Sequence, residues 1–276
     1  MKEKLPTLLA SKQGLFVACA LFQVLDAKDR KLVVKSVQEP LKEMITNKIA
    51  HLFILHILNN LDDTVMSKKK ILSDMLLTID DNKNDENFTR IFIGICSPGA
   101  KRYFMPDDIE SFNAFKEHTS SKKNDDVRRK ELLAIITKPL ETFFEENMLF
   151  YLMDTDKNHL LPKTFAARIE LGGVKESDAI DEMFRQVQKK QHIDGKSQLL
   201  VGHPNLHRVL KELVKLDASV KDSTLDFSRD FSKILIKHID ECLESRAVWI
   251  FVELLEHDNT KDFVLADLKR HKKQID

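Results

Sequence analysis

Three nine-residue segments, GLFVACALF (14–22), AHLFILHIL (50–58) and TRIFIGICS (89–97), share one pattern and recur at nearly constant spacing. Each begins with a small residue, continues as a dense apolar run and is soon followed by polar residues. Their first residues are 36 and then 39 positions apart. A period of about 20–50 residues is typical of repeat proteins, in which each unit buries its apolar face by stacking on its neighbours. The pattern therefore predicts a helical repeat array, a class that more often binds other molecules than catalyses a reaction.

Two looser copies of the pattern lie in the second half of the chain. They begin at Leu206 (LHRVLKELV) and Ala247 (AVWIFVELL), 41 positions apart. The 117 positions from Thr89 to Leu206 leave room for two degraded copies. The repeats are therefore expected to continue to the C-terminal part of the sequence.

The composition favours helix and limits the function classes. The 276 residues include only seven glycines and seven prolines, which is few for a sandwich or barrel. The 44 basic residues balance the 44 acidic ones, so a strong global attraction to nucleic acid is not expected, although a basic stripe on one face is compatible with this balance. The three cysteines are widely separated and indicate a reducing compartment without disulfides. No apolar run reaches the length of about 18–20 residues that spans a bilayer.

Helical periodicity predicts amphipathic helices between the buried ones. These are 28–46, which Pro40 should kink or split, 64–79 with Thr64 as its N-cap, 127–146 and 175–190. The segments 88–95 and 248–252 are β-prone by composition, but the repeat register predicts that they are buried helices. Four polar stretches are expected to form loops: 80–87, 117–126, 188–198 and 217–226. The stretch 117–126 is expected to be a flexible insert.

Motifs for catalysis, metals and cofactors are absent from the sequence. The acidic stretches that begin at Asp80 and Asp154 resemble calcium loops, but both lack the glycine and the glutamate that an EF-hand requires. His203 and His207 lie four positions apart without a further ligand motif, and helix capping and packing explain them more simply. There is no phosphate loop, dinucleotide turn or nucleophile motif. We therefore expect no catalytic site, metal, cofactor or small-molecule substrate.

Basic clusters are the remaining candidates for function. If equivalent faces of stacked repeats line one surface, these side chains would form a stripe that could follow a phosphate backbone. The alternative is that a charged face only keeps the array soluble. The candidate residues are Arg30, Lys31, Lys35, Lys68, Lys69, Lys70, Lys101, Arg102, Lys122, Lys123, Arg128, Arg129, Lys130, Arg208 and Lys211.

Five collinear stretches resemble a known family. They are GLFVACALFQVLDAKDRKLVVKSV (14–37), AHLFILHILNNLDDTVMSKKKILSDML (50–76), FTRIFIGICSPGAKRYFMPDDIE (88–110), SSKKNDDVRRKELL (120–133) and HPNLHRVLKEL (203–213). These runs are similar to the C-terminal half of the Puf-A/penguin branch of the Pumilio-homology proteins, including its CPL region. The resemblance implies an all-α, armadillo-like superhelix, with Pumilio-type repeats in 1–115 and divergent CPL-type repeats in 116–276 that continue the first array.

The same resemblance carries implications for function. Members of this branch bind RNA or DNA with little sequence preference, reside in the nucleus and nucleolus, and act in assembly of the large ribosomal subunit. Related fungal members also act in repression of mRNA. The resemblance therefore implies RNA (pre-rRNA or mRNA), DNA and pre-ribosomal proteins as partners. No membrane partner is expected.

Sequence readout by a Pumilio protein uses two or three side chains from one helix of each repeat. These side chains belong to the first, second and fifth residues after the small residue that begins each repeat segment. Because most of them are apolar here, we expect contacts to the phosphate backbone of the nucleic acid in place of base readout. The five sets are Leu15, Phe16 and Cys19; His51, Leu52 and Leu55; Arg90, Ile91 and Gly94; His207, Arg208 and Lys211; and Val248, Trp249 and Val252. The competing function is a protein-interaction scaffold that does not contact nucleic acid.

Overall fold

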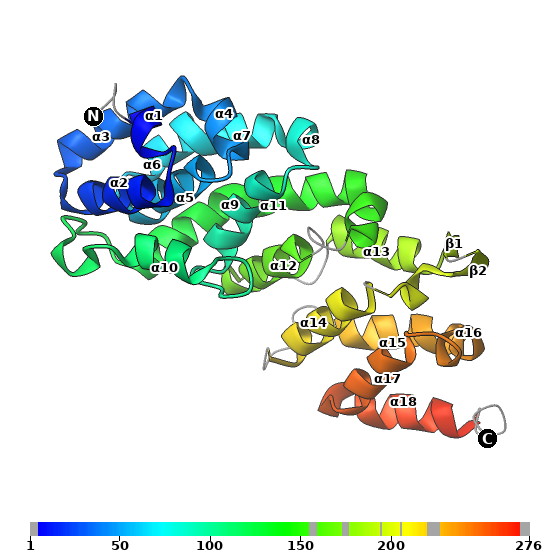
Figure 1. The fold of residues 1–276 in the computed structure, drawn as a ribbon. Coiled ribbons are helices and arrows are strands. Elements are labelled where there is room, and N and C mark those ends of the chain that lie inside the picture. The colour runs from blue at the N-terminus through cyan, green and yellow to red at the C-terminus, as the bar shows by residue number, and fades with distance from the viewer. Residues whose placement is uncertain are drawn as a thin grey trace. The chain divides into compact units, whose positions relative to one another are not determined.

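The computed structural model describes residues 5–154, 159–172, 177–193, 195–204, 206–219 and 227–270 (Figure 1). The chain forms two compact units, Met1–Pro139 and Leu140–Asp276. The border falls at Pro139, inside the long helix α11 (Asp125–Met153). Part of the calcium-like stretch that begins at Asp154, and most of the loop predicted at 217–226, lie outside the described residues. The domain boundary predicted at residue 115/116 stays a prediction.

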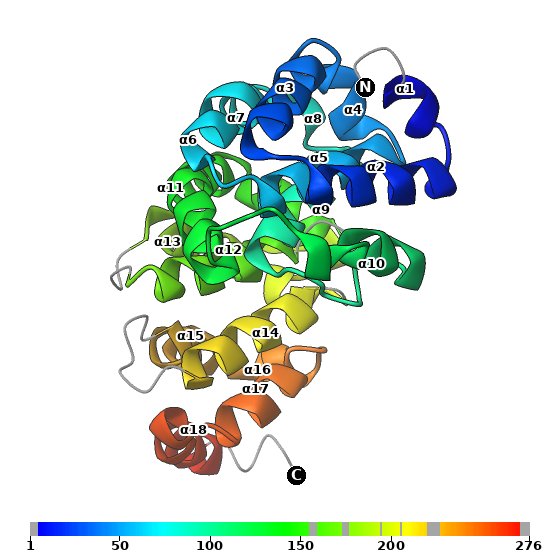
Figure 2. The same ribbon diagram turned by 90° about the vertical axis from the view of Figure 1, so that its left-hand side faces the viewer.

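The three segments that define the repeat form one buried layer of the first unit. They are α2 (Lys12–Val24), α5 (Ala50–Asn60) and α9 (Glu86–Cys96), and α5 packs between the other two (Figures 1 and 2). Ser11 and Asp85 cap α2 and α9 by accepting a backbone N–H of the first turn. The β-prone stretch at 88–95 is helical as predicted, because its apolar side chains fill the space between α5 and its neighbours.

Shorter helices form an outer layer over the buried one (Figure 2). The short helix α1 (Leu5–Leu8) precedes α2. Pro40 splits the first outer helix, as predicted, and the outer helices are α3 (Ala27–Gln38), α4 (Leu41–Thr46), α6 (Thr64–Ser67), α7 (Ser73–Leu77) and α8 (Ile79–Asn82).

Two predictions for the outer layer are wrong in detail. Asp63 caps α6 in place of Thr64, because its carboxylate accepts the Met66 N–H. A π-helical turn, Lys68–Leu72, joins α6 to α7, so 64–79 is not one regular α-helix. The loop predicted at 80–87 is also shorter, because α8 extends to Asn82 and α9 begins at Glu86.

A further layer covers the opposite side of α2 and includes α10 (Pro106–Asn113). After α10 and the 3-10 turn Lys116–His118, residues 119–124 run to α11 without regular structure. We expected a flexible insert here, and that expectation is wrong. The backbone N–H of Ser120 donates to Gln23 O at 3.0 Å, and the Lys122 N–H donates to the Asp62 carboxylate at 2.8 Å. These bonds hold the segment against α2 and the end of α5.

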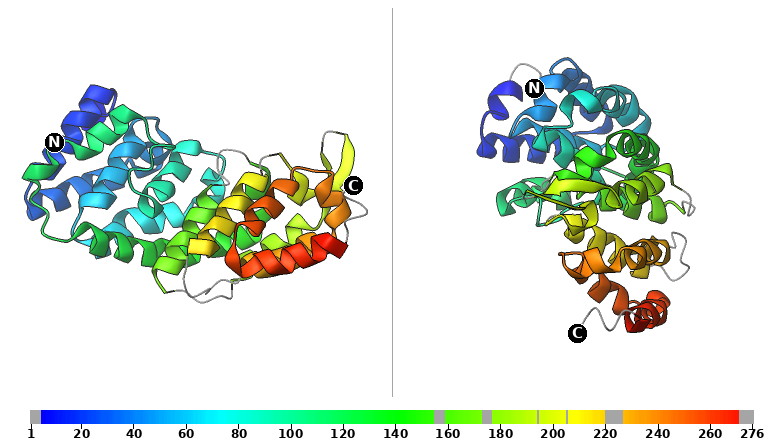
Figure 3. Two further views of the ribbon diagram at one scale, coloured as in Figure 1. Left: turned by 90° about the horizontal axis from the view of Figure 1, so that it is seen from below. Right: turned by 90° about the vertical axis from the view of Figure 1, so that its right-hand side faces the viewer.

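The second unit contains the remaining helices and a small hairpin (Figures 1 and 3). Here α14 packs on α15 and α17, and α18 packs on α15 and α17. The β-prone stretch at 248–252 lies in α17, as predicted. The helices are α12 (Leu160–Glu170), α13 (Asp178–Val187), α14 (Leu206–Ser219), α15 (Phe227–Lys237), α16 (Ile239–Leu243), α17 (Val248–Leu255) and α18 (Asp258–Arg270).

The loop predicted at 188–198 is instead a β-hairpin. Strands β1 (Lys190–Ile193) and β2 (Lys196–Leu199) pair in antiparallel register, with Lys190 opposite Leu199. Gly195 allows the tight turn because its φ of +76° is readily adopted by glycine. The polar composition that suggests a loop is also compatible with a short, solvent-facing hairpin.

Among the described residues, no helix combines the length and apolar character needed to cross a bilayer. The helical fold instead buries its apolar residues between layers, together with the histidines His51 and His56 of α5. Burial lowers the pKa of His51 to about 4 and that of His56 to about 3. Both side chains are therefore neutral in the folded protein at neutral pH.

We expect these two histidines to make the protein less stable in mild acid. The unfolded chain binds protons on them below a pKa of about 6.5, whereas the folded chain does not until pH falls to about 4. Stability therefore falls as pH drops from 7 to 5.5, by about 1 kcal/mol per histidine. Urea titrations followed by far-UV circular dichroism at both pH values measure this loss.

The variant His56→Gln provides the matching comparison. It should lose less stability between pH 7 and 5.5 than the wild type, because one of the two protonation sites is removed. The carboxylates Asp62 and Glu212, whose pKa values are lowered to about 2, do not titrate in this range. An identical pH dependence in variant and wild type would contradict the assignment.

Candidate nucleic-acid interface

The side-chain positions that would read bases are covered in the first three repeats. Of the nine residues on α2, α5 and α9, Phe16 and Arg90 are half-buried and the others are buried. The segment 97–115, which contains α10, lies over this face. These helices therefore cannot present base-reading side chains to solvent in this conformation.

Contacts at Gly94 show how closely the covering segment packs. A Cβ atom at Gly94 would lie 3.0 Å from the Phe104 ring and 2.3 Å from a Leu55 methyl carbon. The Arg90 guanidinium donates to Tyr103 O at 2.5 Å and lies 6.0 Å from the centre of the Phe104 ring. The polar side chain of this set is therefore occupied within the protein.

Three of the six equivalent positions in the second unit are exposed, and the other three, His207, Lys211 and Val248, are half-buried. On α17, the Trp249 side chain is 55% exposed, and Val252 is exposed beside it on the same helix. On α14, which packs against α17, Arg208 is exposed. A solvent-facing tryptophan near cationic side chains is the combination that proteins use to stack and hold single-stranded nucleic acid.

Two arginines make the surroundings of His207 positive. Burial lowers the pKa of His207, and the charges of Arg208 and Arg246 lower it further, while carbonyls at His203 and Pro204 oppose the shift. Both arginines therefore lie within electrostatic range of this imidazole. Neither has an ion-pair partner among the described residues, whereas Lys211 is 3.4 Å from the Glu253 carboxylate. We call His207, Arg208, Arg246 and Trp249 the α14/α17 cluster.

Arg246 is absent from the basic residues that the sequence singled out. It stands alone in the sequence, one position before Ala247, the small residue of its repeat, and so belongs to no group of basic residues. In the sequence, Trp249 is noted only as one of the three apolar residues at the base-reading positions of its repeat. Their proximity to Arg208 depends on the packing of α14 against α17.

Two of the predicted phosphate-binding arginines are committed to the protein interior. Arg30 is 2% exposed and donates to the backbone oxygens of Phe22, Gln23 and Asn60 at 3.0, 2.6 and 2.9 Å. Arg128 is 1% exposed and donates to Asn59 O at 2.9 Å. Since both guanidinium groups bond to the protein and are shielded from solvent, we leave both out of the proposed interface.

Asp62 and Arg128 form the centre of a polar network in the first unit. Asp62 accepts from Arg128 at 2.9 Å, from the Ser121 hydroxyl at 2.5 Å and from the Lys122 N–H at 2.8 Å. Burial alone would raise the pKa of Asp62, but these hydrogen bonds outweigh it and lower the pKa to about 2. Arg128 also donates to Asp125 at 2.6 Å. The network joins the end of α5, segment 119–124 and the start of α11.

The other predicted basic residues of the first unit lie in separate places. Lys31 and Lys35 on α3 are exposed, and α3 packs on the π-helical turn that carries Lys68, Lys69 and Lys70. Lys31 is 2.7 Å from Asp63. Two further residues are half-buried: Lys123 pairs with Glu131, and Arg129 donates to Cys96 O. The remaining ones are exposed, and they are Lys101, Arg102, Lys122 and Lys130.

The described residues contain no group of three His, Cys, Asp or Glu side chains that could hold a metal ion. Each of the three cysteines is buried, and burial raises the pKa of Cys242 to about 12. A thiol in this environment is a poor nucleophile. The chemistry that the surface does offer is charge and stacking.

Replacement of Arg128 by Met should destabilise the protein by about 2–4 kcal/mol. The change leaves Asp62 and Asn59 O without their buried partner, and breaking a buried ion pair from one side costs about this much. Urea unfolding followed by circular dichroism measures the loss. Lys130→Met is the control, because Lys130 is exposed and should change stability by less than about 0.5 kcal/mol. A loss below about 1 kcal/mol for Arg128→Met would contradict the central role of this network.

Comparison with solved structures shows the fold. The chain matches the crystal structure of human Puf-A with a TM-score of 0.84 and 23% identity, over 98% of this chain and 53% of that one. It matches human Puf-A in complex with DNA with a TM-score of 0.82 and 22% identity, over the same shares. These matches confirm the predicted Pumilio-type helical-repeat fold.

Curated relatives agree with the resemblance found in the sequence. Mouse Pumilio homolog 3 is 26% identical over 214 residues, 77% of this chain and 32% of the relative. The Schizosaccharomyces pombe Pumilio homology domain family member 6 is 24% identical over 298 residues, 99% of this chain and 44% of the relative. Drosophila protein penguin is 27% identical over 54% of this chain and 20% of the relative. The chain thus spans between a fifth and a half of the length of these relatives.

A domain family provides the final comparison. The CPL (NUC119) domain family matches residues 84–224, which are 141 of the 276 residues. This range includes the covering segment with α10, Arg128 and all of α14. Since the match extends over more than half of the sequence, the chain belongs to the CPL (NUC119) domain family.

Proposed function

We propose that this chain is a nucleic-acid-binding helical-repeat module that holds single-stranded RNA or DNA through phosphate contacts and stacking. The observation that carries the proposal is the α14/α17 cluster, in which α14 packs on α17, the charges of Arg208 and Arg246 both act on His207, and Arg246 precedes the exposed Trp249 by three residues. Guanidinium groups contact phosphates, and an aromatic face accepts any base. The module acts by binding and not as an enzyme.

Weak sequence preference follows from the covered face of the first unit. Base-edge readout needs donors and acceptors that reach the bases, and the reading positions of α2, α5 and α9 are buried or half-buried. In the α14/α17 cluster the exposed side chains, Arg208, Arg246 and Trp249, are positive or aromatic. Such a surface favours the charge and stacking that all sequences share.

The comparisons support a role with nucleic acid. One matching structure is human Puf-A in complex with DNA, and the curated relatives are Pumilio-homology proteins. For the whole protein we propose a nuclear and nucleolar factor in assembly of the large ribosomal subunit, with pre-rRNA and pre-ribosomal proteins as partners. Repression of mRNA is a second proposed role in the same class. These roles rest on the resemblance to the family.

A second candidate function is a protein-interaction module. On α2, Val17, Leu21 and Val24 are 41–48% exposed at helical spacing and form an apolar stripe. Apolar side chains grouped in this way favour a protein surface as partner. This candidate predicts that partner proteins bind the chain when it has no measurable affinity for nucleic acid.

Binding to a single-stranded RNA across a range of KCl concentrations tests the proposed function. Fluorescence anisotropy should show binding with a steep salt dependence and no ranking among pyrimidine sequences of equal length. The double variant Arg208→Gln/Arg246→Gln should lower the slope of log K against log [KCl] by about 1.4, at about 0.7 per lost phosphate contact. Trp249→Ala should weaken binding by about 1–3 kcal/mol, and Trp249→Phe should retain most of the affinity.

A control variant tests whether the change in slope is specific to the α14/α17 cluster or follows from any loss of positive charge. Arg229→Gln/Lys237→Gln removes two exposed positive charges from α15 and should leave the slope close to that of the wild type. Circular dichroism verifies that each variant is folded. A dissociation constant above millimolar at low salt, or an unchanged slope in Arg208→Gln/Arg246→Gln, would exclude the proposed interface.

A further inference from the structure

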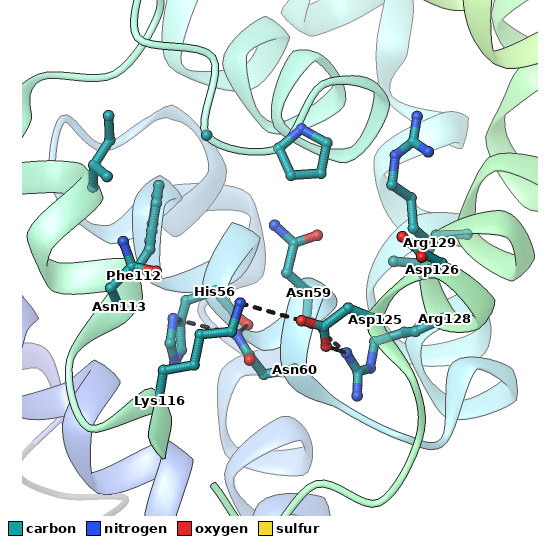
Figure 4. A pocket seen from close by; sticks show the side chains of 14 residues that line it. His56, Asn59, Asn60, Phe112, Asn113, Lys116, Asp125, Asp126, Arg128 and Arg129 are labelled. Atoms are coloured by element: carbon teal, nitrogen blue, oxygen red, sulfur yellow. Dashed lines mark hydrogen bonds and ion pairs between the residues drawn. The ribbon is translucent and has the colours of Figure 1, made fainter. Parts of the chain in front are cut away.

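The polar network of the first unit borders a pocket with two uncommitted amides. The cavity has a volume of about 300 Å³ and lies between the end of α5, the segment with α10 and the start of α11 (Figure 4). Asn59 points into it from α5, and Asn113 lines it at the end of α10. Neither amide has a hydrogen-bond partner among the described residues. Unused amides that face an accessible cavity are suited to a polar ligand.

The rest of the pocket wall is apolar and aromatic. Phe112, Ile109 and Leu132 line it, and the Phe112 ring is fixed by His56, which stacks on it with centroids 6.4 Å apart. A second ring, Phe104, meets Phe112 edge-on at 5.6 Å. The volume is at the lower end of the range for small-molecule sites, about 300–1,000 Å³. A flat heteroaromatic ring with a polar edge matches this combination of size and wall.

Charged side chains at the mouth of the pocket can bind a phosphate attached to the ring. Lys116 reaches across the mouth to Asp125, with 3.2 Å between Nζ and Oδ2, and both side chains are more than half exposed (Figure 4). Arg128 holds the other side of Asp125 from the interior. A phosphate at the mouth can therefore take Lys116 as its partner while Arg128 still neutralises Asp125.

The acidic side chains select among bases. Asp125 and Asp126 line the pocket, and a carboxylate accepts from an exocyclic amino group but repels a carbonyl oxygen. An asparagine amide pairs in bidentate fashion with N6 and N7 of adenine. Guanine, cytosine and uracil each present a carbonyl oxygen, which adenine lacks, and the two nearby arginines that could bind such an oxygen donate to Asn59 O and Cys96 O.

We propose that this pocket binds one adenine base, with its polar edge on Asn59 and Asn113, its ring against Phe112, and its phosphate on Lys116. The inference rests on the proposed function, because the adenine belongs to a bound single strand. It adds a preference at one nucleotide to binding that is otherwise independent of sequence. A free adenine nucleotide offers the same chemistry, and the experiment separates the two sources.

The test compares oligouridylate with the same strand carrying one central adenine. In fluorescence anisotropy, the wild type should bind the adenine-containing strand roughly 10-fold more tightly, within the range of one bidentate base contact. Asn59→Ala/Asn113→Ala should remove that difference and leave the salt slope unchanged. With 2-aminopurine in place of adenine, the preference should be lost, because this base lacks the 6-amino group that the asparagine amide recognises.

Asn84→Ala is the matched control, since Asn84 is an exposed asparagine outside the pocket. It should keep the adenine preference. Equal affinity for the two strands, or a preference that Asn59→Ala/Asn113→Ala retains, would overturn the pocket and leave the proposed function intact.

Adenosine monophosphate supplies the other arm of the test. Saturation-transfer NMR with this nucleotide, and with uridine monophosphate for comparison, reports on the pocket without a strand. If no strand binds, the proposed function fails. Binding of adenosine monophosphate that depends on Asn59 and Asn113 would then identify a free-nucleotide site, and absence of that binding would overturn the pocket as well.

Discussion

The ion pair between Asp62 and Arg128 is the interaction on which the first unit depends. Arg128 is almost fully buried, so its charge must be matched inside the protein, and Asp62 and Asp125 provide the match. Asp62 stands just after α5 and also holds Ser121 and Lys122. A single buried guanidinium thereby joins α5, segment 119–124 and α11, and the pocket beside Asn59 exists because these elements are held together.

The covering segment with α10 changes what a repeat helix can do. In α2, α5 and α9 the residues that could face a nucleic acid are packed under it, and Gly94 has no space for a side chain. The packing increases the apolar area that the first unit buries, and it removes base-edge contacts from that face. We propose that recognition by this unit instead uses groups outside the repeat positions, such as the amides and Lys116 of the pocket.

A neutral chain can still bind a polyanion because electrostatic attraction is local. At an ionic strength of about 0.15 M charges are screened over about 8 Å, so the total charge matters less than the groups within that distance. Several lysines are close to a carboxylate, as Lys211 is to Glu253 and Lys31 is to Asp63. Arg208 and Arg246 differ because no described carboxylate pairs with them, and Trp249 lies nearby on the second of the two packed helices.

The sequence by itself determined the helical repeat class, since the spacing of GLFVACALF, AHLFILHIL and TRIFIGICS requires helices that bury an apolar face on one another. It also determined the split at Pro40, because proline lacks the N–H that a continuous helix needs. The hairpin at 190–199 could not be predicted, because its polar residues suit a loop equally well. Only the tertiary structure decided which cations are available: Arg30 and Arg128 look like surface groups in sequence, but packing places carbonyls and carboxylates around them. Adjacency in the chain does not specify all of those partners, because Asn60 O lies 30 residues from Arg30, and Asn59 O and Asp62 lie 69 and 66 residues from Arg128.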